Sequence, residues 1–66
     1  MNKELERLSK RAQLDANRNQ VELAIINLNR VGAALYVIRS YDPRMESQGK
    51  GYVISRFLPD PNFKED

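Results

Sequence analysis

Apolar side chains recur with helical spacing in the first part of the chain. Leu5, Leu8 and Ala12 stand i, i+3 and i+7 apart, so a helix would carry them on one face. The charged residues between positions 3 and 11 would lie on the opposite face, in contact with water. This pattern predicts an amphipathic helix over residues 2–14.

A second helix is predicted over residues 17–32, after a break at residues 15–17. Asn17 is a favourable N-cap residue, Gln20 stands where it completes a capping box, and Gly32 suits the C′ position that ends a helix. The apolar stripe between these signals consists of Val21, Ala24, Ile25 and Leu28. This stripe lies roughly opposite to that of the first helix, which favours two helices joined by a turn. One long bent helix is the alternative.

Two strands are predicted in the second half of the chain. Residues 33–41 and 51–58 are rich in β-branched and aromatic residues, and Asp42-Pro43 begins a turn that leads into the polar loop 44–50. We expect the two strands to pair as an antiparallel hairpin. A hairpin is not stable alone in water, and both strands carry apolar residues on both faces. We therefore expect the hairpin to pack on the helices and the chain to self-associate.

Together these elements predict an α+β fold, with two helices or one bent helix followed by an antiparallel β-hairpin, in a dimer. Residues 1–58 would form a single helix-plus-hairpin domain, and residues 59–66 a short acidic tail whose prolines cannot continue a sheet. Residues 1–58 hold ten Lys/Arg and six Asp/Glu, a balance of +4, whereas residues 59–66 hold one and three, a balance of −2. A mildly basic body is compatible with a polyanionic partner.

The composition limits the kinds of catalytic and metal-binding site that the chain can form. The chain has 66 residues and no cysteine or histidine, which removes the commonest zinc ligands, the cysteine nucleophile and the usual general base near neutral pH. The carboxylates have no spacing that suits acid–base catalysis, and Gly49-Lys50-Gly51 lacks the surroundings of a phosphate-binding loop. We expect no enzyme activity, no cofactor and no metal. Because no apolar run is long enough to span a bilayer and no signal-peptide core is visible, we expect a cytoplasmic protein without a membrane partner.

A family resemblance provides a more specific hypothesis. It is carried by Leu14-Asp15-Ala16-Asn17-Arg18-Asn19-Gln20-Val21 followed by Ala24-Ile25-Ile26-Asn27-Leu28-Asn29-Arg30-Val31-Gly32-Ala33. This region resembles the recognition helix of winged helix-turn-helix DNA-binding domains, where a turn, a polar cap, an apolar helix and a closing glycine run straight into the wing. The resemblance covers residues 8–56. It implies a small regulatory protein that binds duplex DNA and acts in transcription regulation.

The resemblance also implies a set of DNA contacts. Arg18, Asn19 and Glu22 would face the major groove, where arginine and asparagine side chains make bidentate contacts to bases. The phosphate contacts would come from Arg44 and Lys50 in the wing loop and from Lys10 and Arg11 in the first helix. The alternative for Arg18 and Asn19 is an ordinary polar first turn exposed to solvent.

A rival hypothesis starts from two apolar residues on the face that would meet DNA. Leu23 and Ile26 are more naturally buried against protein, and a helix that is apolar nearly all round is covered on both sides. They are therefore candidates for an oligomer interface. The rival function is a small homo-oligomeric protein-binding adaptor or inhibitor without nucleic-acid binding, in which an exposed hairpin edge recruits a partner strand.

Two further patterns leave alternatives open. Leu14, Val21 and Leu28 recur every seven residues, which fits either a short coiled-coil seam or ordinary core packing. Strand aromatics beside Arg39 and Arg56 would suit a stacking platform for single-stranded nucleic acid, although two strands make a poor platform.

Overall fold

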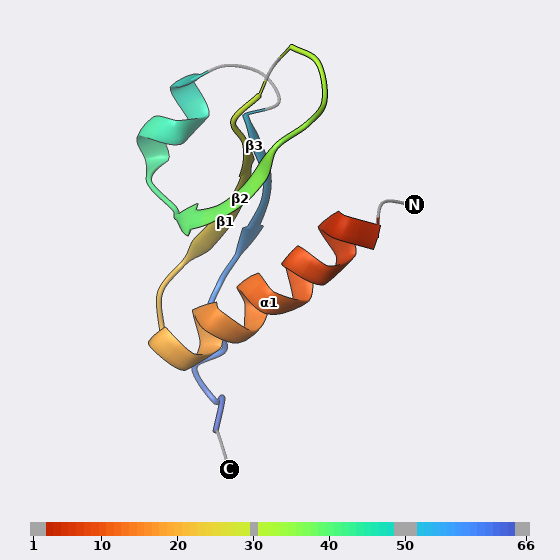
Figure 1. The fold of residues 1–66 in the computed structure, drawn as a ribbon. Helices are drawn as coiled ribbons and strands as arrows, with labels where there is room; N and C mark the ends of the chain where they lie inside the picture. Colours follow the sequence, from red (N-terminus) through yellow and green to blue (C-terminus); the bar gives the residue numbers. More distant parts are fainter. Residues whose placement is uncertain (1–2, 30, 49–51, 65–66) are drawn as a thin grey trace.

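One helix precedes three strands in the computed structural model, which describes residues 3–29, 31–48 and 52–64 (Figure 1). The elements in chain order are α1 (Lys3–Asn19), β1 (Leu23–Asn27), β2 (Tyr36–Ser40), the short 3-10 helix η1 (Pro43–Gln48) and β3 (Val53–Phe57). The predicted α+β class is confirmed. The arrangement of elements within that class differs from the prediction in three respects: the second helix, the end of the first helix and the pairing of the strands.

The predicted second helix is wrong, because its apolar centre is the strand β1. Residues 23–26 are all buried, as expected for a central strand that is covered on both faces. Such a strand reads as a short continuous apolar run, which periodicity alone cannot distinguish from a buried helix. The β-branched pair Ile25-Ile26 favours the strand. Val21 and Leu28 lie partly exposed on either side of β1. The seven-residue recurrence of Leu14, Val21 and Leu28 is therefore neither a coiled-coil seam nor a single stripe of core residues.

The helix α1 passes through the predicted break and ends at Asn19. Gln20 takes a left-handed conformation, with φ of 53°, and Val21 N–H donates to the carbonyl of Ala16 at 3.2 Å. This is the hydrogen bond of a Schellman C-cap. Asn17 therefore lies in the last turn of a helix and is not the N-cap of a second one.

Both predicted strands are present, but they do not pair with each other. The sheet has the order β2-β1-β3, and both neighbours run antiparallel to β1. Ile25 stands opposite Ile38 on one side and Ser55 on the other. The central strand β1 therefore lies between the two strands that were predicted to pair as a hairpin. Ile54 is the extra residue of a bulge in β3, and the predicted loop contains η1.

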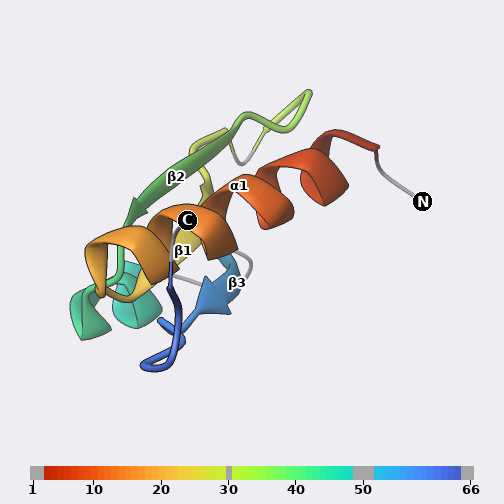
Figure 2. The same ribbon diagram turned by 90° about the horizontal axis from the view of Figure 1, so that it is seen from below.

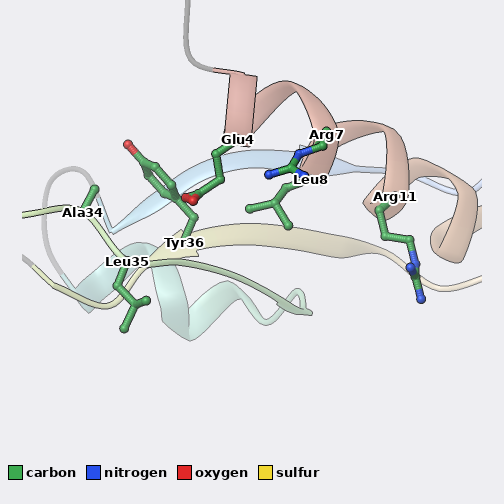
Figure 3. A pocket seen from close by; sticks show the side chains of 7 residues that line it. All are labelled: Glu4, Arg7, Leu8, Arg11, Ala34, Leu35 and Tyr36. Carbon is green, nitrogen blue, oxygen red and sulfur yellow. The ribbon is translucent and has the colours of Figure 1, made fainter.

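The sheet separates two layers. Figure 1 shows α1 on one face and η1 on the opposite face. The helix approaches closely because its inner residues Ala12 and Ala16 are small and fully buried. Tyr36 points toward α1 (Figure 3), and neighbouring residues alternate between faces, so the register puts Ile25 on the helix side and Ile26 on the other. The apolar core therefore extends through both faces of β1.

The residues after β3 lie against the C-terminal half of α1. Gln13 Nε2 donates to the Leu58 carbonyl at 2.8 Å, and Asp60 N–H donates to Asn17 Oδ1 at 2.8 Å. Gln20 Nε2 donates to the Asp60 carbonyl at 2.9 Å. Three amide side chains thus bind the backbone where the predicted tail begins.

Candidate functional site

The edge strand β2 has one side that no described strand covers. Tyr41 N–H donates to the Glu22 carbonyl and Leu28 N–H to the Leu35 carbonyl, each at 2.9 Å. These two pairs bracket the β1–β2 ladder. In an antiparallel ladder, hydrogen-bonded pairs recur at every second residue, so the intervening odd-numbered residues of β2 also bond to β1.

The even-numbered residues of β2 therefore present their backbone groups to the open edge. These residues are Tyr36, Ile38 and Ser40. Their side chains lie on the face that α1 covers, as the orientation of Tyr36 shows (Figure 3). A row of unpaired N–H and C=O groups is a template for pairing with another strand.

A groove of about 590 Å³ lies beside this edge, between α1 and the start of β2. Figure 3 shows Glu4, Arg7 and Leu8 descending from α1 toward Tyr36, whereas Leu35 points away from the helix. The lining residues are Glu4, Arg7, Leu8, Arg11, Ala34, Leu35 and Tyr36. The groove thus combines an apolar floor with charged groups from one helix face.

Positive charge gathers along the helix wall of this groove. Arg7 also lines a neighbouring depression of about 470 Å³ together with Lys3, Glu6 and Lys10. Arg11 Nε lies 3.1 Å from Asp15 Oδ2 in an exposed ion pair. Within the part of the chain that the structure describes, the Arg7 side chain has no hydrogen bond or ion pair. Its guanidinium is available to an anionic group in the groove.

The loop between β1 and β2 exposes an unbroken apolar run. Residues 31–35 are all exposed, with 85% of Val31 and 54% of Leu35 accessible. Polar contacts link the two ends of this loop, because Asn27 Oδ1 accepts hydrogen bonds from the N–H groups of Asn29 and Leu35 at 3.1 Å. Gly32 has φ of 88°, which an L side chain rarely adopts. This apolar surface continues into the groove through Ala34 and Leu35.

A polar network crosses the face of the sheet away from α1. Arg56 Nε lies 2.7 Å from Glu22 Oε2, its guanidinium stacks on the Tyr41 ring, and the Tyr41 hydroxyl donates to Glu46 in η1 at 3.1 Å. Desolvation and the hydrogen bond to Glu46 raise the pKa of Tyr41, and the hydrogen bond to Glu22 raises the pKa of Arg56. The network joins β3 to the residues that precede β1 and follow β2, and to η1.

The residues predicted to bind DNA do not gather on one surface. Lys10, Arg11, Arg18 and Asn19 lie exposed on α1. Glu22 is held by Arg56, and Arg44 lies in η1, on the opposite side of the sheet (Figure 1). Arg44 Nη2 pairs with Asp42 Oδ2 at 2.7 Å, and hydrogen bonds from Arg44 lower the pKa of Asp42. Lys50 falls outside the described residues.

Residues 17–32, which the winged-helix resemblance assigned to a recognition helix, contain the last residues of α1 and the strand β1 and do not form one helix. Leu23 and Ile26, predicted at an oligomer interface, are 8% and 2% exposed within a single chain. Leu23 shares the helix side of β1 with Ile25, and Ile26 lies on the other side. Their burial therefore requires no second copy.

The groove residues Arg7, Leu35 and Tyr36 were not predicted from the sequence. One signal was present, because Val31-Gly32-Ala33-Ala34-Leu35 is apolar throughout and yet contains a glycine suited to ending an element. Arg7 gave no signal of its own, since only the fold brings α1 beside the start of β2.

The described residues were searched for metal-binding clusters and for membrane-spanning helices. No group of three or more Asp or Glu side chains there is placed to hold a metal ion, and no described helix is both long and apolar enough to cross a bilayer. Comparisons with protein-family models, with curated proteins and with solved structures find no match.

In Figure 2, which shows the molecule from below, α1 lies in front of the sheet. Together, Figures 1 and 2 show that α1 and β2 run in about the same direction. The groove adjoins the open edge where β2 begins, at Tyr36, so an extended chain that follows this edge would be able to contact helix and strand at once.

Proposed function

We propose that this chain is a small non-enzymatic protein-binding adaptor or inhibitor that recruits its partner through the open edge of β2. The observation that carries the proposal is the exposed apolar run 31–35, which continues into a groove beside an unpaired strand edge. Contiguous exposed apolar surface beside polar groups is characteristic of protein interaction sites.

The open edge supplies the second argument. Natural proteins protect free strand edges with charge, proline, bulges or a covering segment. β3, the other edge strand, carries a bulge at Ile54, whereas the β2 register is regular from Leu23–Ser40 to Asn27–Tyr36. A regular edge bordered by apolar residues suits the addition of a partner strand, which binds by main-chain hydrogen bonds.

Self-association is one form of this function. A chain of this size buries only a modest part of its surface and often gains stability from a partner or a second copy. Pairing of two β2 edges would join two three-stranded sheets into a homodimer. A strand from another protein would use the same backbone groups of β2, so dimer formation and binding of that protein would compete.

Photo-cross-linking tests the proposal. A photoreactive phenylalanine analogue placed at Val31 should yield a discrete covalent adduct with a partner protein, or with a second copy of the chain, in cells. The same analogue at Asn62, which is exposed in the C-terminal segment, serves as the matched control. An adduct from position 31 alone supports the proposal. Equal yields from both positions, or none from either, contradict it.

Duplex DNA binding is the second candidate function. It is favoured by the exposed cations along α1, which include Lys10, Arg11 and Arg18. Fluorescence anisotropy with duplex DNA at two salt concentrations tests it, because phosphate contacts weaken steeply with salt. Lys10→Ala and Arg18→Ala should each reduce binding and its salt dependence. Absence of binding at low salt would remove this candidate.

A further inference from the structure

We propose that the groove between α1 and β2 binds an extended acidic segment of a partner protein, with carboxylates at alternate positions. This inference rests on the proposed protein-binding function and specifies its ligand. The segment adds a strand to the edge of β2, and its carboxylates meet Arg7 and Arg11 on the wall of the groove. The direction of the strand, the spacing of the arginines and the charge of the helix favour this ligand.

The backbone of β2 decides which ligand side chains face the helix. Tyr36, Ile38 and Ser40 present their N–H and C=O groups to the open edge and their side chains to the α1 side. Ligand residues directly opposite them share that face, because cross-strand partners point to the same side of a sheet. Every second ligand side chain therefore faces the α1 side of the sheet, where the groove lies, and the others lie beside Val37 and Arg39.

The spacing of the two arginines matches that alternation. Residues two apart in a strand are about 6.7 Å apart on one face. Residues four apart in a helix rise by about 6 Å. Because α1 and β2 run in about the same direction (Figures 1 and 2), the backbone positions of Arg7 and Arg11 repeat beside the groove at nearly the ligand's own period. Two carboxylates in a Glu-x-Glu pattern would each meet one arginine.

The charge of the helix wall selects an acidic ligand. The groove itself is lined by Arg7 and Arg11 against Glu4, and the neighbouring depression by Lys3, Arg7 and Lys10 against Glu6. This excess of positive charge attracts a polyanionic segment and disfavours a basic one. The ion pair of Arg11 with Asp15 is exposed, so exchange of Asp15 for a ligand carboxylate costs little.

Titration of the full chain with a labelled synthetic peptide tests the inference. The probe is a peptide of about eight residues that alternates glutamate and valine, long enough to cover β2 and its flanks. The control peptide has the same composition with its glutamates grouped at one end. Fluorescence anisotropy should show binding of the alternating peptide and much weaker binding of the grouped one. NMR should show perturbed amides at Tyr36, Ile38 and Ser40.

Two variants separate the side-chain and backbone contributions. Arg7→Ala should weaken binding of the alternating peptide about two- to fivefold, as expected for an exposed ion pair. Ser40→Pro removes an N–H at the open edge, and should weaken binding about two- to tenfold. Arg39→Ala, an exposed arginine of β2 on the other face, is the matched control and should change affinity less than Arg7→Ala.

Equal affinity of the two peptides, or equal losses in Arg7→Ala and Arg39→Ala, would overturn the inference. So would a stable dimer in sedimentation that excludes the peptide, since the edge would then belong to a second copy. These results leave the broader proposal separately testable. If peptide binding fails while the cross-link from Val31 persists, the chain binds protein through this surface and only the class of ligand is wrong.

Discussion

The guanidinium carbon of Arg56 lies 4.0 Å from the centroid of the Tyr41 ring. Arg56 belongs to β3 and Tyr41 follows β2, so the contact spans the face of β1 between the two edge strands. Ala24, which stands opposite Arg56 in the register, is fully buried and small enough to let the longer side chains cross above it. The contact joins β3 to β2 on the face that α1 does not cover.

Replacement of Arg56 should loosen this face of the sheet. Arg56→Ala removes both the ion pair with Glu22 and the stacking on Tyr41, so we expect the thermal unfolding midpoint to fall by a few degrees. Arg56→Lys keeps the charge but loses the planar group, and should fall between alanine and wild type. An unchanged midpoint for Arg56→Ala would show that the contact contributes nothing measurable.

The raised pKa of Tyr41 predicts a loss of stability at high pH. Desolvation is the largest cause and the hydrogen bond to Glu46 the next, and both favour the neutral phenol in the folded state. The unfolded chain ionises at its ordinary pKa of about 10. This contribution is therefore complete below that pH and is lost as pH rises through the folded pKa. Chemical denaturation at increasing pH should show a shallower decline in Tyr41→Phe than in the wild type, and parallel declines would contradict the assignment.

Asn17 should matter more to stability than its neighbour Asn19. Asn17 Oδ1 accepts hydrogen bonds from Gln13 at 2.9 Å and from the backbone N–H of Asp60 at 2.8 Å. Asn17→Ala should lower the free energy of unfolding by about 1 kcal/mol, the net contribution of a typical hydrogen bond. Asn19→Ala is the matched control, because Asn19 is exposed at the end of the same helix. Equal effects in urea denaturation would indicate that attachment of the C-terminal segment is not the cause.

Gly32 is required by its backbone conformation and not by space. A Cβ at this position would meet only the Asn29 side-chain nitrogen at 4.0 Å, but φ is 88°. Gly32→Ala should therefore cost about 1–2 kcal/mol of unfolding free energy through left-handed backbone strain. Gly32→Asn should cost less, because asparagine tolerates this region better. If both variants match the wild type in denaturation, the loop relaxes without strain.

The assignment of residues 23–27 to a central strand predicts opposite behaviour of two apolar residues. Ile25 is fully buried, so Ile25→Ala should lower the free energy of unfolding by about 2–5 kcal/mol. Leu28 is 45% exposed beyond the end of β1, and Leu28→Ala should cost well under half as much. A helix over residues 17–32 would place both residues in one apolar stripe with comparable losses. Similar values for the two variants would therefore contradict the strand.

Local sequence pattern was sufficient to locate α1, β2 and β3. The stripe of Leu5, Leu8 and Ala12 located most of α1, because its helical period reflects one covered face. Enrichment in β-branched and aromatic residues located β2 and β3, whose apolar residues lie on both faces. The same reasoning failed for residues 23–26, which are buried on both sides and so carry no period. The helix end at Gln20 was also missed, because a non-glycine residue adopts the left-handed C-cap conformation there.

By itself, the sequence determined the α+β class, the positions of one helix and two strands, and the absence of cysteine and histidine chemistry. Only the tertiary structure decided that β1 separates β2 from β3, that the edge of β2 stays open, and that Arg7 lines a groove beside it. The physical reason is that a local pattern records how many sides of a segment are covered. It does not record which distant segment supplies the cover, and the candidate site is built from such distant neighbours.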